Sequence, residues 1–103
     1  MDLFKEIVQD ALEKIGIETK PKSFIDPVTI SIITQIVFTV LPLVISLGKE
    51  LIPIIIKYIP QIIAIINKTK GGNELACSWG KKISDVTKSF IPKIVDEFKK
   101  SHH

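Results

Sequence analysis

The stretch LVISLGKELIPIII, residues 43–56, interrupts a long apolar segment with its only pair of adjacent charges. On either side of that pair, residues 28–47 carry no charge and residues 51–66 carry only Lys57. Gly48 followed by two charged residues is typical of a turn, because glycine often ends helices and charges favour water. We therefore predict two hydrophobic helices that form a hairpin, with their polar stripes facing each other or a neighbouring copy. One long kinked helix over residues 27–68 is the alternative that the sequence leaves open.

The apolar segments are predicted to be helical although they are rich in isoleucine, which favours strands. Proline donates no hydrogen bond to a sheet, so Pro42, Pro53 and Pro60 would each interrupt a central strand. A helix tolerates them as kinks, which we predict at all three. The prolines lie on one helical stripe with a set of polar residues, and the prolines and polar residues together recur every three or four positions. The polar residues are Ser31, Gln35, Thr39, Ser46, Glu50, Lys57 and Gln61. We assign this polar stripe to assembly with other copies or to the lining of a pore.

At 103 residues the chain has the length of one helical domain. We divide it into an amphipathic arm (residues 1–26), the hydrophobic hairpin (27–66), and a loop followed by a basic amphipathic helix (67–103). The first arm places apolar residues at spacings of three and four from residue 3 to residue 15. Asp2 is its expected N-cap and Gly16 its expected stop.

The last helix is also amphipathic, with Asn73 as its expected N-cap and bends expected at Gly80 and Pro92. Its polar face is rich in lysine. We regard four of these lysines as candidate contacts to lipid headgroups or another polyanion. They are Lys81, Lys82, Lys88 and Lys93.

The sequence offers no pattern of catalytic or ligand-binding residues. Cys77 is the single cysteine, the histidines are confined to positions 102 and 103, and no glycine-rich phosphate loop is visible. All 14 basic residues are lysine, which lacks the fork with which arginine reads guanine. We therefore expect no enzymatic activity, no cofactor, no metal, no small-molecule substrate and no sequence-specific binding of nucleic acid.

A chain of this size has little surface with which to cover two hydrophobic helices. We therefore expect a structural or assembly protein that associates with lipid, such as a small viral coat or membrane protein or an accessory subunit of a membrane complex. Its expected partners are copies of itself or a larger assembly, and a lipid bilayer. Its expected location is a membrane or a virion, with both arms on the same side. A pore-forming protein of holin or toxin type is one alternative, and a soluble four-helix bundle that mediates interactions is another.

Overall fold

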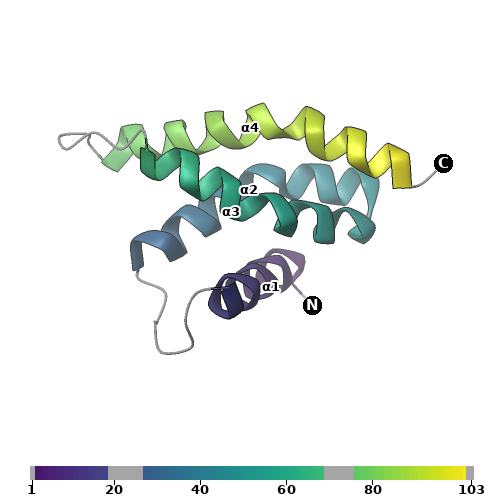
Figure 1. Cartoon of the computed structure of the whole chain (residues 1–103), viewed down its shortest axis with the longest axis horizontal. Coiled ribbons are helices and arrows are strands. Elements are labelled where there is room, and N and C mark those ends of the chain that lie inside the picture. The colour runs from purple at the N-terminus through teal and green to yellow at the C-terminus, as the bar shows by residue number, and fades with distance from the viewer. Residues whose placement is uncertain (1, 19–26, 69–75, 102–103) are drawn as a thin grey trace.

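The computed structural model describes residues 2–18, 27–68 and 76–101, and their regular structure is entirely helical. The described elements, in chain order, are α1 (Leu3–Glu18), α2 (Pro27–Leu47), the short 3-10 helix η1 (Lys49–Leu51), α3 (Ile52–Lys68) and α4 (Ala76–Ser101) (Figure 1). The prediction of an all-α fold, with two long apolar central helices between amphipathic ones, is confirmed.

Helices α2 and α3 form an antiparallel hairpin that turns at Gly48 (Figure 1). Gly48 has φ 106° and ψ 168°, a backbone conformation that is almost restricted to glycine. Its amide donates to the carbonyl of Val44 (2.7 Å), and its carbonyl accepts from the amide of Leu51 (3.2 Å). The helical hydrogen bonds of α2 therefore end here, and the alternative of one long helix is wrong.

The interior of the hairpin is built almost entirely from isoleucine and valine. The fully buried residues of α2 and α3 are Ile32, Ile33, Ile36, Val37, Val40, Val44, Ile55, Ile59, Ile62 and Ile66. Each such side chain stabilises the fold by about 1.5–3 kcal/mol when it leaves water. These residues recur every three or four positions, so each hydrophobic helix has one side that belongs to the core.

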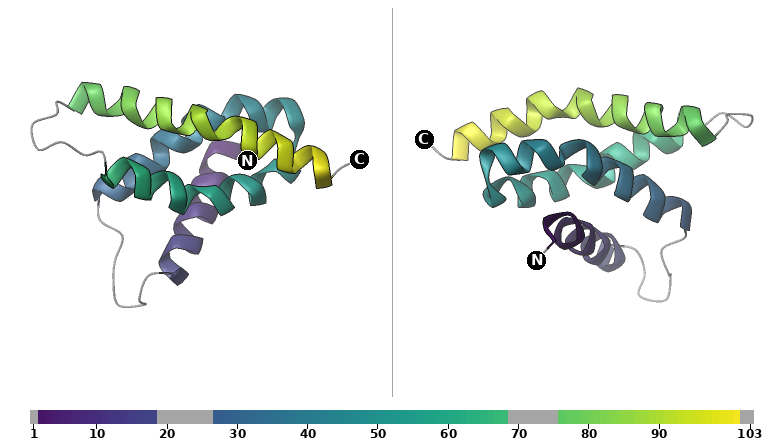
Figure 2. Two further views of the ribbon diagram at one scale, coloured as in Figure 1. Left: turned by 45° about the horizontal axis from the view of Figure 1, so that its top comes forward. Right: turned by 180° about the vertical axis from the view of Figure 1, so that it is seen from behind.

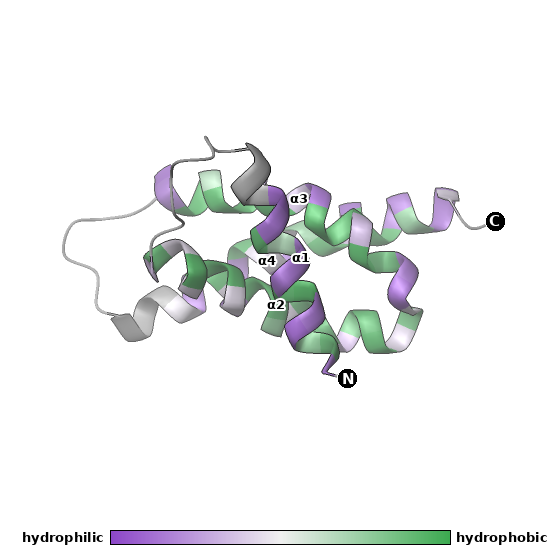
Figure 3. Ribbon diagram, turned by 90° about the horizontal axis from the view of Figure 1, so that it is seen from below, coloured by the Kyte–Doolittle hydropathy of each residue, from purple (hydrophilic) through white to green (hydrophobic). Residues whose placement is uncertain are grey.

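The two amphipathic helices cover opposite sides of this hairpin. Helix α4 lies lengthwise against both α2 and α3, and α1 crosses the other side (Figures 1 and 2). Helix α4 buries Ile83, Phe90 and Ile94, whereas α1 buries Ile7 and Ala11. Hydropathy follows this division, with apolar colour over most of α2 and polar segments along α1 (Figure 3). The radius of gyration, 13.7 Å, is close to the value of about 13 Å expected for a folded chain of this length.

The ends of α1 illustrate one correct prediction and one error. Asp2 caps the helix, since its carboxylate accepts a hydrogen bond from the amide of Phe4 at 3.0 Å. The helix then runs through Gly16 to Glu18, so the predicted stop at Gly16 is wrong. A glycine inside a helix costs only about 1 kcal/mol relative to alanine, which does not by itself end the helix.

Helix α4 continues without interruption through Gly80 and Pro92. The predicted cap at Asn73 lies outside the described residues, as do the two histidines and the side chain of Cys77.

Candidate functional site

Most of the polar stripe of the hairpin is exposed. Five of its members are exposed, namely Ser31, Ser46, Glu50, Lys57 and Gln61, and the other two, Gln35 and Thr39, are half-buried. Because α2 and α3 turn isoleucine and valine toward each other, their polar residues do not face each other within the hairpin, and that part of the prediction is wrong. A role of the stripe in contacts with neighbouring copies stays a prediction.

The three prolines of the stripe occupy different positions in their helices. Pro42 lies inside α2 and Pro60 inside α3, where each removes one helical hydrogen bond. Pro53 is instead in the first turn of α3, where its missing amide hydrogen has no helical partner to lose.

One member of the stripe, Lys57, is held by α4. Its Nζ lies 3.1 and 3.0 Å from the two carboxylate oxygens of Glu97, and the hydroxyl of Tyr58 donates to Glu97 Oε1 at 2.8 Å. The ring of Tyr58 also packs against Phe90, with the centroids 6.0 Å apart. Lys57, Tyr58 and Glu97, which we call the Glu97 cluster, thereby join α3 to the C-terminal half of α4.

The two donors stabilise the ionised form of Glu97. The hydrogen bond from Lys57, followed by that from Tyr58, lowers the pKa of this carboxyl below its ordinary value, against the opposing effect of partial burial. The carboxylate therefore remains charged at neutral pH, and α4 keeps an anchor for the one cationic side chain within the apolar part of α3.

A weaker polar contact joins α4 to α2. The hydroxyl of Thr39 donates to the carbonyl of Gln35 at 2.8 Å and lies 3.4 Å from the hydroxyl of Ser84, which is long for a hydrogen bond between hydroxyls. The polar stripe thus contacts α4 on both helices of the hairpin, which sequence spacing did not predict.

Sequence reasoning missed Glu97, although the sequence contains a signal for it. Glu97 follows Ile94 by three residues and Phe90 by seven, which puts a carboxylate beside the apolar stripe of α4. Lys57 is likewise the only charge in its apolar segment. Two opposite charges, each on a largely apolar helix, are the pattern that could have paired them.

The four candidate lysines of α4 do not form a single patch. Lys81, Lys88 and Lys93 are exposed, whereas Lys82 is half-buried. Lys81 and Lys88 lie two turns apart, on either side of Ser84 along α4, and Ser84 contacts Thr39 of α2. Lys93 lies on a different side, with its Nζ 5.2 Å from the ring centre of Phe90.

An exposed apolar surface on α2 was also missed. Phe38 is 66% exposed and Ile45 69%, Pro42 is exposed between them, and Leu41 is half-buried. We call these four residues the α2 face. The ring of Phe4 in α1 meets that of Phe38 edge-on, with the centroids 6.4 Å apart. The face was missed because α2 is apolar around most of its circumference, so periodicity does not indicate which apolar side lacks a cover.

Comparison with known protein families, curated proteins and solved structures found no match. Within the described ranges, no group of three or more histidine, cysteine, aspartate or glutamate residues is arranged to hold a metal ion. Helix α2 (Pro27–Leu47) and the helical stretch Lys49–Lys68, which comprises η1 and α3, are each long and apolar enough to cross a membrane. The core helices of soluble proteins share this property. The candidate functional features are therefore surfaces: the polar stripe, the Glu97 cluster and the α2 face.

Proposed function

We propose that the protein is a non-enzymatic structural or assembly protein that associates with membranes through its hydrophobic hairpin. The observation that carries this proposal is the pair of consecutive antiparallel helices, each apolar and each of a length that can span a bilayer. A helix of about 20 residues is about 30 Å long, which is the thickness of the hydrocarbon core. The exposure of Phe38 and Ile45 adds support, because α2 keeps apolar surface in contact with water even when α1 and α4 are in place.

Lipid could replace α1 and α4 as the cover of the hydrophobic hairpin. Helices α1 and α4 cover the isoleucines of the hairpin with apolar side chains, and hydrocarbon is a comparable apolar environment. The polar contacts that α4 would give up include those of the Glu97 cluster and the Thr39 hydroxyl. In the proposed membrane form the hairpin enters the bilayer and both amphipathic helices lie on one surface.

The proposed assembly lies in the membrane of a virion or in a cellular membrane. It consists of several copies of this chain or of this chain with other subunits. Two spans return the chain to its starting side, so both arms share one compartment. The lysines of α4 make that side the cytoplasm or the interior of a virion.

Fractionation and sedimentation test the membrane proposal. The full chain is expressed without detergent, the membranes are collected and washed at alkaline pH, and the extracted protein is sedimented with and without detergent. We expect the chain to stay with the washed membranes and to sediment as a protein–detergent particle. A monomer in the aqueous fraction would overturn the proposal.

Recovery of a monomer from the aqueous fraction would instead support a soluble four-helix bundle that mediates interactions. The observation in its favour is the closed packing, in which α1 and α4 bury apolar residues against the hairpin and Glu97 pairs with Lys57.

Release of dye from vesicles tests the pore-forming alternative. Release that is lost in the Lys57→Leu variant supports a path lined by the polar stripe. Release that is absent, or unchanged in that variant, excludes it.

A further inference from the structure

We propose that the α2 face is the surface with which the closed four-helix form first contacts an anionic lipid bilayer. This inference rests on the proposed membrane association and deepens it, because it names the contact surface and the kind of lipid. The closed form would bind with its helices intact, before any entry of the hairpin.

The α2 face has the form of an interfacial apolar contact. Phe38, Leu41 and Ile45 follow one another at helical spacing, so their side chains lie on one side of α2 over two turns. Among the large hydrophobic side chains of the described residues, Phe38 and Ile45 are the most exposed, and the remainder of the exposed set is at most 47% exposed. A side of a helix that exposes several apolar residues in succession can enter the boundary between headgroups and acyl chains.

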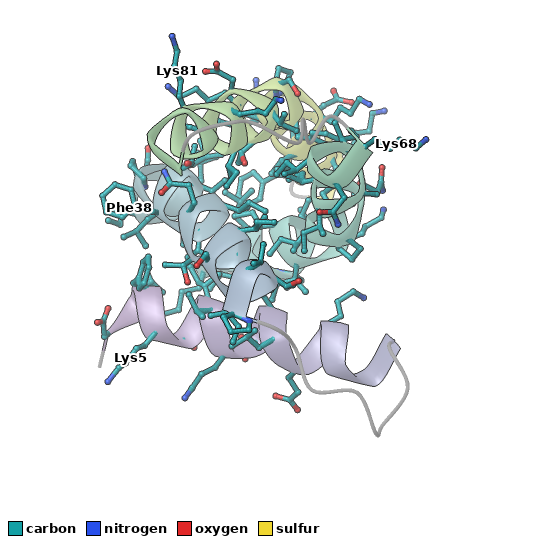
Figure 4. All side chains as sticks on the ribbon, turned by 90° about the vertical axis from the view of Figure 1, so that its left-hand side faces the viewer. Lys5, Phe38, Lys68 and Lys81 are labelled. Atoms are coloured by element: carbon teal, nitrogen blue, oxygen red, sulfur yellow. The ribbon has the colours of Figure 1, made fainter. Side chains whose placement is uncertain are left out.

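Lysines flank this face on both sides. In Figure 4, Phe38 and Lys5 of α1 point to the same side of the molecule and Lys68 points to the opposite side, whereas Lys81 rises from α4 away from α1. Lys88 lies two turns beyond Lys81 on the same flank of α4, and all of these lysines are exposed. The apolar side chains would thus enter the bilayer while the ammonium groups reach the headgroup level.

The acidic residues near this side offset the lysines only in part. Asp2 accepts a hydrogen bond from the amide of Phe4 as the cap of α1. Asp96 pairs with Lys100 at 3.3 Å. Asp85 lies between Lys81 and Lys88 on the same flank of α4, so two lysines face one acid there. This flank of α4 therefore keeps a net positive charge, which favours an anionic surface.

The same charges argue against a second copy as the occupant. In a symmetric dimer the face would meet an identical face, so the flanking lysines of the two copies would come close together. Like charges in such a contact repel, whereas phosphate groups attract lysine. An anionic bilayer satisfies both the apolar centre and the basic flanks.

Binding of the purified full chain to vesicles tests the proposal. The partition coefficient is measured by flotation with vesicles of phosphatidylcholine alone and of phosphatidylcholine with phosphatidylglycerol. The variants Phe38→Ser and Ile45→Ser are each expected to lower it by roughly tenfold, since serine has little apolar area to bury in the bilayer at either position. Ile65→Ser, at an exposed apolar position on α3, is the matched control and is expected to stay within about twofold. Ile45→Ser keeps the test valid if loss of the Phe4 contact unfolds the other variant.

Charge is tested with a second pair of variants. Lys5→Gln and Lys81→Gln are each expected to lower partition into the anionic vesicles by about fivefold, and to have no effect on the neutral vesicles. Lys68→Gln on the opposite side is the control and is expected to leave both values unchanged.

The outcomes separate this inference from the proposed function. If the wild type binds anionic vesicles but the Ile45→Ser and Ile65→Ser variants bind equally, the named face is wrong while membrane association stands. If the chain fractionates with membranes in cells but the closed form binds no vesicles, the inference alone fails. Self-association that Ile45→Ser abolishes, without vesicle binding, would assign the face to a second copy and overturn the inference.

Discussion

Replacing Gly48 with alanine measures the backbone cost of the hairpin turn. At φ 106° and ψ 168° a residue with a side chain is strained, whatever space surrounds it. A Cβ at position 48 meets no atom within 4 Å, so the substitution adds no clash with neighbouring parts of the fold. The expected loss is therefore the local conformational energy alone, about 1–3 kcal/mol. Each kcal/mol lowers the Tm of a domain of this size by about 4–8 °C.

Gly80→Ala is the matched control, because it makes the same chemical change in the opposite backbone context. Gly80 lies within α4, and a Cβ there also meets nothing within 4 Å. Alanine is favoured over glycine inside a helix, so this variant should gain about 0.5–1 kcal/mol. The two substitutions should shift stability in opposite directions.

Urea unfolding followed by far-UV circular dichroism gives the free energy of unfolding of both variants. A Gly48→Ala variant as stable as the wild type would refute the reasoning, because it would mean that the chain does not turn in this conformation at residue 48. D-Alanine at the same position, introduced by chemical ligation, offers an internal check. Its mirror-image preference accepts a positive φ, so it should recover most of the lost stability.

Further predictions concern the core and the Glu97 cluster. Ile55→Ala should lower the free energy of unfolding by about 2–5 kcal/mol because Ile55 is fully buried, whereas the exposed Ile45→Ala should change it by less than about 0.5 kcal/mol; equal effects in urea unfolding would contradict the assigned burial. Glu97→Gln should destabilise the fold at neutral pH by removing the charge opposite Lys57, and the deficit should shrink in high salt, as unfolding at two ionic strengths would reveal. Because the pKa of Glu97 is lowered in the fold, its stabilisation is complete above the ordinary value of 4.5 and is lost as the pH falls through the lowered value; a gap between wild type and Glu97→Gln that stays constant into acid would rule this out.

The hairpin could be predicted from sequence because its turn is marked locally. Gly48 stands where two apolar runs meet two adjacent charges, and the structure turns at that residue. The cap at Asp2 was equally local, since a carboxylate next to exposed helical amides needs no distant partner. Features that depend on residues within one turn of the chain could therefore be predicted from the sequence.

The packing of the helices was harder to predict from the sequence, because α2 is apolar on nearly every side. Periodicity places a helix against a core when one side is polar, as in α4, where Ile83, Phe90 and Ile94 are buried. In α2 the buried Ile36 and the exposed Phe38 are both apolar, so their different environments depend on where α1 and α4 lie. The pairing of Lys57 with Glu97 likewise joins residues that are 40 positions apart.

The isoleucine and valine core also has a consequence for how the molecule can move. Inside a helix a β-branched side chain keeps one χ1 rotamer about 90% of the time, so these residues have little rotamer freedom to lose on folding and few alternative packings to explore. Motion in such a core is restricted mainly to the terminal methyl groups of isoleucine. The closed form should therefore move as a set of stiff rods, and a transfer of the hairpin into lipid must separate whole helices rather than loosen the interior one side chain at a time.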